Sequence, residues 1–249
     1  MDRLQAAQQA IDKTRAAFPD GSGNQSEDLF ASGFRGNHRW RVTRQNGYWD
    51  YDESKPVKSN EARDYAERYP EAARAARVDI AGGGGCAEFG AYVFDILRQE
   101  LPREPVYRVH RNNLDHSFVI IGGLKEDKPE HNEPDEALVV ADPWPTSPRA
   151  CIWTDHFAYS KDRSSIVIDK RVKGEPFDAR KRIREALVLS DEGKQRINEP
   201  RITDQEVAKY VAESRNAPGD EGYIWTLART MKDQELDRNR VYVENFDKQ

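Results

Sequence analysis

The chain has 249 residues, of which 33% are charged and 37% hydrophobic, and its formal net charge is −5. Because acidic and basic residues are spread along the whole sequence, this charge gives no electrostatic case for binding nucleic acid. The aromatic content of 10% argues against wholesale disorder, although the mean hydropathy of −0.92 indicates a modest core and much solvated surface.

The sequence carries no sign of membrane spans, disulfides or metals. No stretch approaches the roughly 18 consecutive apolar residues of a membrane-spanning helix. The N-terminal segment lacks the apolar core of a Sec-type signal peptide, although an export signal of another kind would not show in composition. Two cysteines, Cys86 and Cys151, are not a disulfide framework and favour a reducing compartment. The five histidines are scattered and neither CxxC nor HExxH occurs, so we expect no metal and no other cofactor.

The first third of the chain predicts helices on either side of a loop-rich segment. Apolar residues at helical spacing predict a first helix that ends at Pro19-Asp20-Gly21. Residues 20–60 are rich in Gly, Asn, Asp and Ser, with Trp and Tyr between them. We interpret them as a loop or short hairpin pinned to the core, with a ligand cage as the alternative. Residues 61–78 are rich in alanine and charge and predict a helix interrupted near Pro70.

A run of four glycines, residues 82–85, precedes Cys86 and an apolar-periodic stretch that predicts a helix ending before Pro102. Cys86 is therefore expected in the first turn, where free backbone N–H groups and the helix dipole stabilise a thiolate. Glycine lets the backbone approach closely, so the N–H groups of Gly84 and Gly85 are candidate oxyanion donors. The alternative is a cysteine that only packs in the core, as free cysteines commonly do.

Two strand-like runs follow, residues 116–122 and 136–142. An antiparallel pairing centred near residue 129 places three pairs opposite each other: His116 with Asp142, Phe118 with Val140, and Ile120 with Leu138. Opposed residues have Cβ atoms about 5 Å apart, so the carboxylate of Asp142 would hold one imidazole nitrogen of His116 and fix the ring. A one-residue slip would turn every side chain to the opposite face, so the register decides whether they meet.

A third run, Val106–His110, is expected to pair with the His116 strand through an Asn-rich turn. This pairing puts His116 on the central strand of a three-stranded meander. His110 is a rival base, but we interpret it as a surface-loop histidine. His156 adjoins an aspartate yet has no strand-borne carboxylate partner in the sequence.

Three further residues or segments receive structural interpretations. Cys151 lies in a predicted short strand and is interpreted as a core residue. Glu88 is interpreted as a first-turn dipole partner, with a general base as the alternative. The basic-leaning stretch from Lys170 to Arg184 is interpreted as a solvated helix face. Thr203-Asp204-Gln205-Glu206 is a capping box that opens a helix through about Ser214, and another helix is expected over residues 221–237.

Three pieces of the sequence resemble the papain-like fold, in the wide sense that includes transglutaminase-like enzymes and bacterial papain-like toxin and effector domains. They are Gly85–Phe89 at the head of a helix, His116–Ile120 at the head of a strand, and Val139–Trp144 at the end of the next strand. The strand that ends in Asp-Pro-Trp looks more like the bacterial domains than like lysosomal proteases. The similarity covers about residues 80 to 155.

The resemblance implies an α+β fold in which a papain-like core carries the nucleophile helix on a small antiparallel sheet, with helices flanking it at both ends. We assign residues 1–74 to an N-terminal extension, 75–168 to the catalytic core and 169–249 to a C-terminal extension of one compact domain. The resemblance also implies Cys86 as nucleophile, His116 as general base and acid, and Asp142 as the residue that orients the imidazole.

The sequence departs from papain in two respects. Papain places a glutamine shortly before its cysteine for the oxyanion hole, whereas this chain has Asp79-Ile80-Ala81 and the four glycines there. The oxyanion donors would then be backbone N–H groups, such as that of Cys86 with one from a preceding glycine. The short separation between the cysteine and the histidine leaves no room for a full second lobe. Both departures suit a compact, selective enzyme.

These residues predict a thiol hydrolase or acyltransferase in which His116 takes the proton of Cys86 and the thiolate attacks a carboxamide or peptide carbonyl. Water as the second reactant gives glutamine or asparagine deamidation, or proteolysis, and a lysine amine gives transamidation. Trp144 and Trp153 would line the acyl-side groove, with core packing as the alternative. A catalytically silent protein-binding module is the alternative from another class, and ligand spacing argues against a metalloenzyme.

The resemblance further implies a virulence effector or toxin, a deamidase or protease that acts on a protein of a host or competitor cell. We expect export through a specialised non-Sec system into the cytosol of the target cell, and otherwise a cytoplasmic location. A secretion chaperone or an immunity protein is the expected additional partner.

Overall fold

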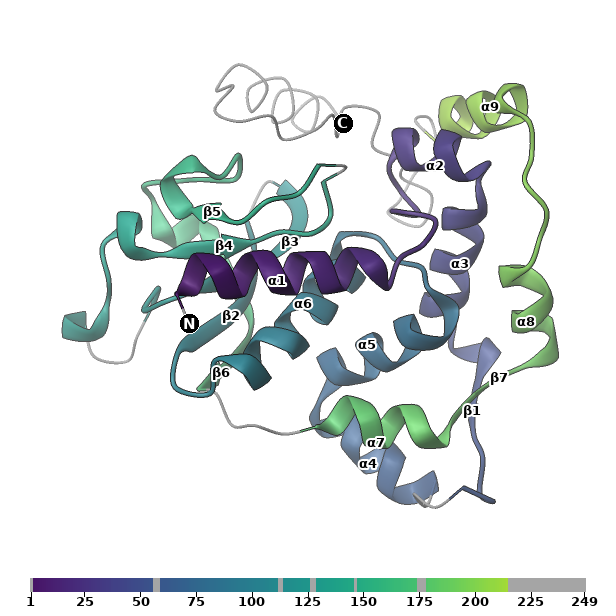
Figure 1. Cartoon of the computed structure of the whole chain (residues 1–249), viewed down its shortest axis with the longest axis horizontal. Coiled ribbons are helices and arrows are strands. Elements are labelled where there is room, and N and C mark those ends of the chain that lie inside the picture. The colour runs from purple at the N-terminus through teal and green to yellow at the C-terminus, as the bar shows by residue number, and fades with distance from the viewer. Residues whose placement is uncertain are drawn as a thin grey trace. The chain divides into compact units, whose positions relative to one another are not determined.

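The computed structural model describes residues 2–55, 59–111, 114–125, 129–145, 147–173 and 178–214. These residues form helices and antiparallel sheets, which confirms the predicted α+β class (Figure 1). They divide into two compact units. We call residues 2–14 and 89–173 the sheet unit, and residues 15–88 and 178–214 the helical unit. These limits differ from the expected boundaries at residues 74 and 168.

The sheet unit is built on a five-stranded antiparallel sheet with the order β5-β4-β3-β2-β6. Its strands are β2 (Pro105–Arg111), β3 (Leu114–Ile121), β4 (Val139–Ala141), β5 (Cys151–Ile152) and β6 (Ile166–Lys173). Strand β3 lies between β2 and β4, so the predicted meander with His116 on its central strand is confirmed. The short strand predicted around Cys151 is also confirmed.

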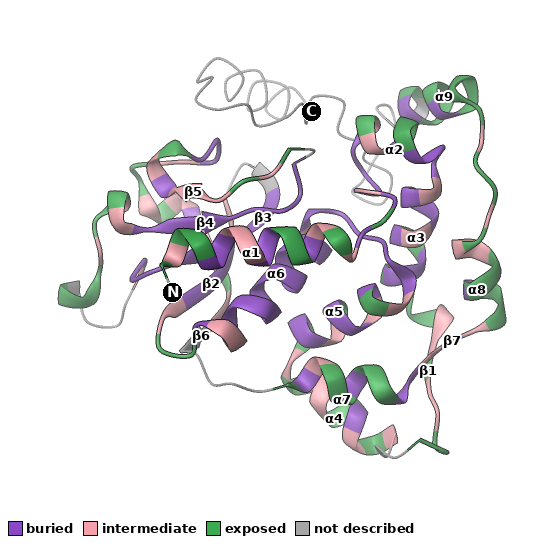
Figure 2. Cartoon of the chain, viewed as in Figure 1, coloured by how far each residue is buried: buried purple, intermediate pink, exposed green. Residues whose placement is uncertain are grey.

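Two helices contribute to the sheet unit, α1 (Arg3–Ala16) and α6 (Cys86–Glu100). Figure 2 shows α6 buried along almost its whole length, whereas α1 has one buried and one exposed side. Lys13 of α1 forms an ion pair with Glu100 of α6. The predicted start of α6 at Cys86 is confirmed, and its last residue lies two positions before Pro102, which cannot continue a helix.

The register of β3 and β4 differs from the predicted one by two residues. Ile120 pairs with Val140 rather than with Leu138. The predicted pairing was wrong because Leu138 ends the 3₁₀ turn η3 (Asp135–Ala137) and its carbonyl accepts a hydrogen bond from the Trp153 N–H at 2.8 Å. A shift of two residues keeps each side chain on its face of the sheet. His116 and Asp142 therefore still share a face.

The helical unit contains α2 (Ser26–Ser32), α3 (Arg35–Arg44), α4 (Ser59–Arg68), α5 (Pro70–Ala81), α7 (Ala179–Ala186), α8 (Asp191–Ile197), α9 (Asp204–Ser214) and a two-stranded sheet of β1 (Trp49–Tyr51) and β7 (Leu187–Leu189). The loop or hairpin predicted over residues 20–60 was largely wrong, because α2 and α3 lie there. The buried residues of α3 include Asn37, His38 and Thr43, so its inward face has no apolar periodicity to reveal a helix.

Several local predictions for this unit are confirmed and one is wrong. Helix α4 ends at Arg68 and α5 begins at Pro70. In the capping box, the Thr203 N–H donates to Glu206 at 2.9 Å and the Glu206 N–H donates to the Thr203 hydroxyl at 3.3 Å. The single helix face predicted from Lys170 was wrong, because β6 occupies its first residues and pairs with β2. The helix predicted over 221–237 lies outside the described residues.

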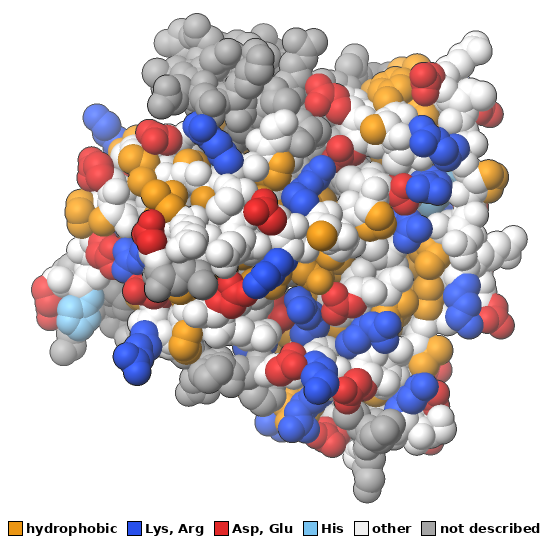
Figure 3. All heavy atoms as spheres, viewed as in Figure 1, with side chains coloured by type: hydrophobic (Ala, Val, Ile, Leu, Met, Phe, Trp, Pro, Cys, Tyr) orange, Lys and Arg blue, Asp and Glu red, His pale blue; other side chains and the backbone are white. Residues whose placement is uncertain are grey.

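The described surface shows charged side chains of both signs close together, as Figure 3 illustrates for one face. Many of them form pairs, such as Arg182 with Glu61 at 2.9 Å. Among the residues that the structure describes, no helix is both long enough and apolar enough to span a membrane.

Candidate active site

The predicted meeting of His116 and Asp142 is confirmed within the sheet unit. His116 lies on β3, and Asp142 directly follows β4. Nε2 of His116 lies 2.6 Å from Oδ2 of Asp142, and the two side chains are 0% and 2% exposed. The diagonal placement that follows from the observed register is close enough for this bond. The imidazole is therefore held by a buried carboxylate, as the sequence predicted.

Asp142 has two further hydrogen-bond donors. The backbone N–H of Trp144 donates to Oδ1 at 3.2 Å, and Nε2 of His156 lies 3.1 Å from Oδ2. The sequence does not predict the bond from His156, because Asp142 is neither next to it in sequence nor on a strand expected to pair with it. The only sequence signal was its position shortly after the Asp-Pro-Trp segment. The carboxylate thus joins two histidines rather than one.

The charge state of Asp142 follows from these partners. Burial alone would raise the pKa of Asp142, but the positive charge of His116 and the hydrogen bonds from both histidines outweigh it and lower the pKa below its usual range. Asp142 is therefore ionised and can only accept hydrogen bonds, so both imidazoles donate to it through Nε2. Burial, with the nearby charges of Asp142 and Asp155, raises the pKa of the Cys151 thiol to about 12. Cys151 is therefore an unreactive, protonated thiol.

Aromatic rings surround His116. The ring centroids of Trp144, Phe157 and Phe118 lie 4.7, 5.1 and 5.7 Å from that of the imidazole. Trp144 is only 1% exposed and Trp153 is fully buried. This burial fits the alternative of core packing and corrects the expectation that the two tryptophans line a substrate groove. Their rings instead restrict the orientation of the imidazole and its neighbours.

Cys86 belongs to the helical unit, where it is the first residue of α6 and 6% exposed. Gly83, in the glycine run before it, is needed for packing against α3. A Cβ atom at Gly83 would lie 2.3 Å from Cβ of Arg39 and 2.5 Å from the backbone N of Trp40. Gly82 has a φ of +64°, the left-handed conformation that commonly ends a helix, here α5. The glycine run therefore has a structural reason that does not depend on catalysis.

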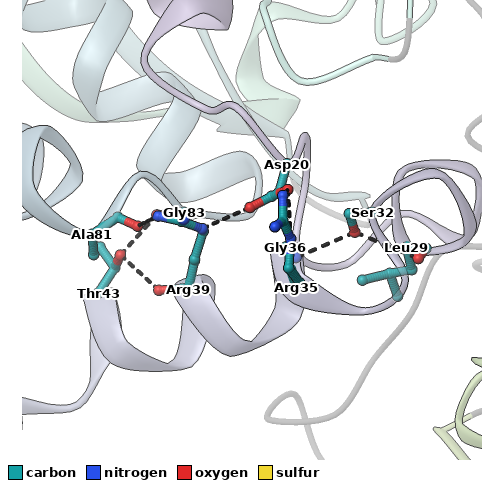
Figure 4. Close-up of polar contacts among 9 residues, drawn as sticks. All are labelled: Asp20, Leu29, Ser32, Arg35, Gly36, Arg39, Thr43, Ala81 and Gly83. Carbon is teal, nitrogen blue, oxygen red and sulfur yellow. Dashed lines mark hydrogen bonds and ion pairs between the residues drawn. The ribbon is translucent and has the colours of Figure 1, made fainter. Parts of the chain in front are cut away.

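Hydrogen bonds from α3 hold the glycine segment in place, as Figure 4 shows. The Thr43 hydroxyl donates to the Gly83 carbonyl at 2.8 Å, and the Arg39 guanidinium donates to the Ala81 carbonyl at 2.8 Å. The buried carboxylate of Asp20 accepts from Arg39 at 2.6 Å and from Arg35. The backbone that leads into Cys86 is thus fixed by side chains from a helix that the sequence did not predict.

Glu88 caps the start of α6, as its interpretation as a first-turn partner predicts. Its Oε2 accepts the Gly85 N–H at 2.9 Å and the Trp40 indole N–H at 3.1 Å, and its Oε1 lies 3.1 Å from Nε of Arg44. This bond commits the Gly85 N–H, so the expectation that Gly85 donates to an oxyanion is corrected. The corresponding role of Gly84 stays a prediction.

Asn24 is a second residue that the sequence analysis missed. Its carboxamide packs on Gly85, where an added Cβ would lie 3.0 Å from Oδ1 and 3.2 Å from Cγ and Nδ2. The Ser22 hydroxyl donates to Oδ1 at 2.8 Å, which orients the amide. Asn24 is 6% exposed and lies against the residue that precedes Cys86. Asn24 is far from Cys86 in sequence, so the glutamine position of papain, shortly before the cysteine, does not point to it.

Two other histidines, His110 and His38, form separate pairs with carboxylates. His110 lies on the surface, as predicted, with Nδ1 2.6 Å from Asp169, and its side chain is 41% exposed. His38 lies 3.1 Å from Glu199 in the helical unit. In the described parts of the chain, no three His, Cys, Asp or Glu side chains are arranged to hold a metal ion.

Comparisons with protein-family models, with curated proteins and with solved structures found no match to the chain. The function must therefore be argued from the residues themselves. The structure brings together His116, Asp142 and His156 in the sheet unit. In the helical unit it brings together Cys86, Glu88 and Asn24.

Proposed function

We propose that the chain is a papain-like, cysteine-dependent hydrolase or acyltransferase, with Cys86 as nucleophile, His116 as general base and acid, and Asp142 as the orienting carboxylate. The observation that carries this proposal is the buried 2.6 Å bond between His116 and Asp142. A carboxylate in this position fixes the imidazole tautomer and stabilises the imidazolium that forms during acyl transfer. The sequence predicted this pair from the antiparallel pairing of the two strands that carry it.

Helix α6, which begins at Cys86, contacts β3 inside the sheet unit. A Cβ atom at Gly90 of α6 would lie 3.1 Å from the hydroxyl and 3.3 Å from the carbonyl of Ser117, the residue after His116. Helix α6 is continuous from Cys86, and residues four apart lie on one helix face. Cys86 therefore shares its helix face with Gly90, one turn earlier. The reaction of its thiol with the His116 imidazole is proposed from the sequence resemblance.

The first half-reaction follows from these roles. Because Nε2 of His116 donates to Asp142, Nδ1 is assigned to take the proton from Sγ of Cys86. The thiolate attacks the carbonyl carbon, a C–S bond forms, and the carbonyl π electrons move to oxygen. When the tetrahedral intermediate collapses, the C–N bond breaks and the leaving amine or ammonia takes the proton from His116. Water then hydrolyses the thioester and regenerates the thiol.

The oxyanion of this reaction requires hydrogen-bond donors near Cys86. The Gly85 N–H is committed to Glu88. We therefore assign the role to the N–H of Cys86, the first residue of α6, and to the amide of Asn24, oriented by Ser22. Gly84 is the backbone alternative. This assignment replaces the glutamine that papain-like proteases carry shortly before their cysteine.

For the substrate, we propose a protein of a host or competitor cell, and for the reaction, glutamine or asparagine deamidation or proteolysis by an exported effector or toxin. The sequence resemblance alone supports this choice. Transamidation is the alternative outcome of the same thioester. The low exposure of Cys86, 6%, favours the second candidate function, a catalytically silent protein-binding module.

Alkylation by iodoacetamide at pH 6 distinguishes the enzyme from the silent module. We expect fast alkylation of Cys86 in the wild type and slow alkylation in His116→Ala, because a protonated imidazole partner stabilises the reactive thiolate at that pH. Cys151 is the internal control, since its pKa of about 12 keeps it protonated. Equal, slow labelling of both cysteines in both proteins would contradict the proposed nucleophile.

Intact-mass analysis of candidate target proteins then identifies the reaction. Targets captured with Cys86→Ala are incubated with the wild type or with that variant. A gain of about one mass unit indicates deamidation, two fragments indicate proteolysis, and an amine adduct indicates transamidation. Only the wild type should produce any of these changes.

A further inference from the structure

His156 is buried beside the proposed catalytic pair, yet no step of the proposed reaction uses it. It follows the 3₁₀ turn η4 (Trp153–Asp155). Its Nε2 lies 3.1 Å from Oδ2 of Asp142, the same oxygen that accepts the hydrogen bond from His116, and its side chain is 1% exposed. A third group on the orienting carboxylate must affect how that carboxylate holds His116.

The other ring nitrogen of His156 fixes its tautomer. The backbone N–H of Ala158 donates to Nδ1 at 3.3 Å. Nδ1 therefore carries a lone pair, and the ring proton is on Nε2, directed at Asp142. Burial, the largest effect, lowers the pKa of His156, although the neighbouring carboxylate of Asp142 raises it. The lowered pKa favours the same neutral form of the imidazole. His156 thus supplies Asp142 with a hydrogen-bond donor but no charge.

The ring of His156 has little freedom to turn. Its centroid lies 4.5 Å from that of Phe157, 4.7 Å from that of Phe118 and 5.9 Å from that of Trp153. Its backbone N–H donates to the Trp153 carbonyl at 3.1 Å. The donor that His156 presents to Asp142 is therefore fixed in direction by packing and by the backbone.

We propose that His156 is a positioning residue, which together with the Trp144 N–H holds the Asp142 carboxylate in the one orientation that aligns the imidazole of His116. The donors reach both carboxylate oxygens, so rotation of the carboxylate would break at least one bond. By sharing Oδ2, His156 also weakens the attraction that this oxygen exerts on a protonated His116. Any effect of His156 on the reactivity of Cys86 rests on the proposed function, but its effect on His116 does not.

Few other groups influence this cluster electrostatically. Among the described residues, the charges that act on His156 are those of Asp142 and His116. The charges of Asp142 and Asp155 also act on Cys151 of β5, but with a pKa of about 12 its thiol stays neutral. A shift of the His116 titration midpoint in a variant of His156 therefore reports on the Asp142 carboxylate that the two histidines share.

Two variants separate positioning from packing. His156→Phe keeps an aromatic ring and removes the donor, whereas His156→Gln keeps a neutral N–H donor and removes the ring. We expect the midpoint of the His116 NMR titration to rise by about one pH unit in His156→Phe, because the unshared carboxylate attracts the imidazolium more strongly. In His156→Gln it should stay close to the wild-type value. The pH profile of Cys86 alkylation should move with the midpoint.

A purely structural role predicts the opposite order, since phenylalanine preserves the packing better. Equal midpoints in all three proteins, or a larger displacement in His156→Gln, would overturn the proposal. Should His156→Phe not fold, His156→Leu removes the donor with another apolar side chain. The wild type gives a test without any variant, because ¹⁵N chemical shifts must show His156 as the Nε2–H tautomer, and an Nδ1–H tautomer would also overturn it. Absence of fast alkylation in the wild type would reject the proposed function, while the NMR results would still decide the role of His156.

Discussion

Two buried carboxylates, Glu88 in the helical unit and Asp142 in the sheet unit, have the same exposure of 2% but different partners. Glu88 is held by a backbone N–H, an indole N–H and guanidinium groups. Asp142 is held by a backbone N–H and two imidazoles. Of these partners, only the imidazoles exchange protons near neutral pH. Two equally buried carboxylates therefore differ in whether their partners can exchange protons.

The same contrast holds for the segments that carry the two carboxylates. The glycine run before Cys86 suggested an anion-binding loop, yet Gly83 is required by the close approach of α3, and the Gly85 N–H is committed to Glu88. The strand ends that carry His116 and Asp142 are marked in the sequence by their predicted pairing and by the Asp-Pro-Trp segment. The conspicuous motif is largely structural, and the two imidazoles that can exchange protons are brought together on Asp142 in the sheet unit.

The largest effect is expected from Asp142→Asn. An asparagine is neutral and presents an N–H₂ group as well as an oxygen, so it cannot stabilise the imidazolium of His116 as a carboxylate does. We expect turnover of the target protein, and alkylation of Cys86 at pH 6, to fall by about 10³-fold or more. Asp169→Asn, which removes the carboxylate partner of the exposed His110, is the matched control and should have little effect. Equal losses of turnover and alkylation in Asp142→Asn and Asp169→Asn would contradict a specific role for Asp142.

A large effect on stability is expected from Glu88→Ala. The variant leaves the Gly85 N–H and the Trp40 indole N–H without their buried acceptor. We expect the free energy of unfolding, measured by urea denaturation, to fall by about 2–4 kcal/mol. Glu61→Ala, which breaks a half-exposed pair with Arg182, should cost less than about 1 kcal/mol. If both variants cost the same, Glu88 would not have the structural role that its contacts indicate.

Gly83→Ala tests whether the glycine run is structural. The new Cβ would lie 2.3 Å from Cβ of Arg39, so α3 must move. Overpacking of this kind costs about 1–3 kcal/mol of unfolding free energy. Gly47→Ala is the matched control, because a Cβ there meets nothing within 4 Å. A Gly83→Ala protein as stable as wild type but unable to be alkylated at Cys86 would instead indicate a direct catalytic role.

The smallest expected effect is a pH dependence of the free energy of unfolding. It should arise at the Asp142 site, which includes His156, and not at the Glu88 site. The pKa of His156 is lowered in the folded state, so below its ordinary value of about 6.5 the unfolded chain binds a proton that the folded chain does not. The free energy of unfolding should fall with decreasing pH below 6.5, by at most about 1.4 kcal/mol per pH unit for this histidine. His38, whose pKa burial also lowers, adds a contribution of the same sign.

Denaturation series between pH 7 and pH 5 measure this slope. It should be smaller in His156→Gln than in the wild type and unchanged in Glu88→Ala, because no histidine bonds to Glu88. The lowered pKa of Asp142 stabilises the fold above its unfolded value of about 4, and this stability is lost only at lower pH. An unchanged slope of unfolding free energy against pH in His156→Gln would mean that His156 is not neutral in the folded protein.

Local rules in the sequence determined the start of α6 at Cys86, the break at Pro70, the capping box at Thr203 and the central strand that carries His116. Each depends on residues within a turn of a helix or along one strand, where periodicity, proline and capping spacing act directly. The shared face of His116 and Asp142 was also predicted correctly, because a two-residue change of register preserves it.

Tertiary structure alone decided the register, the helices α2 and α3, and the second histidine on Asp142. The connection between β3 and β4 is too long to set a register, so the η3 turn and the Trp153 N–H determine where the ladder begins. Helix α3 buries polar residues that are satisfied by distant partners, so no apolar period reveals it. His156 reaches Asp142 only because of the path that the chain takes after β5, and no rule of local spacing contains that path.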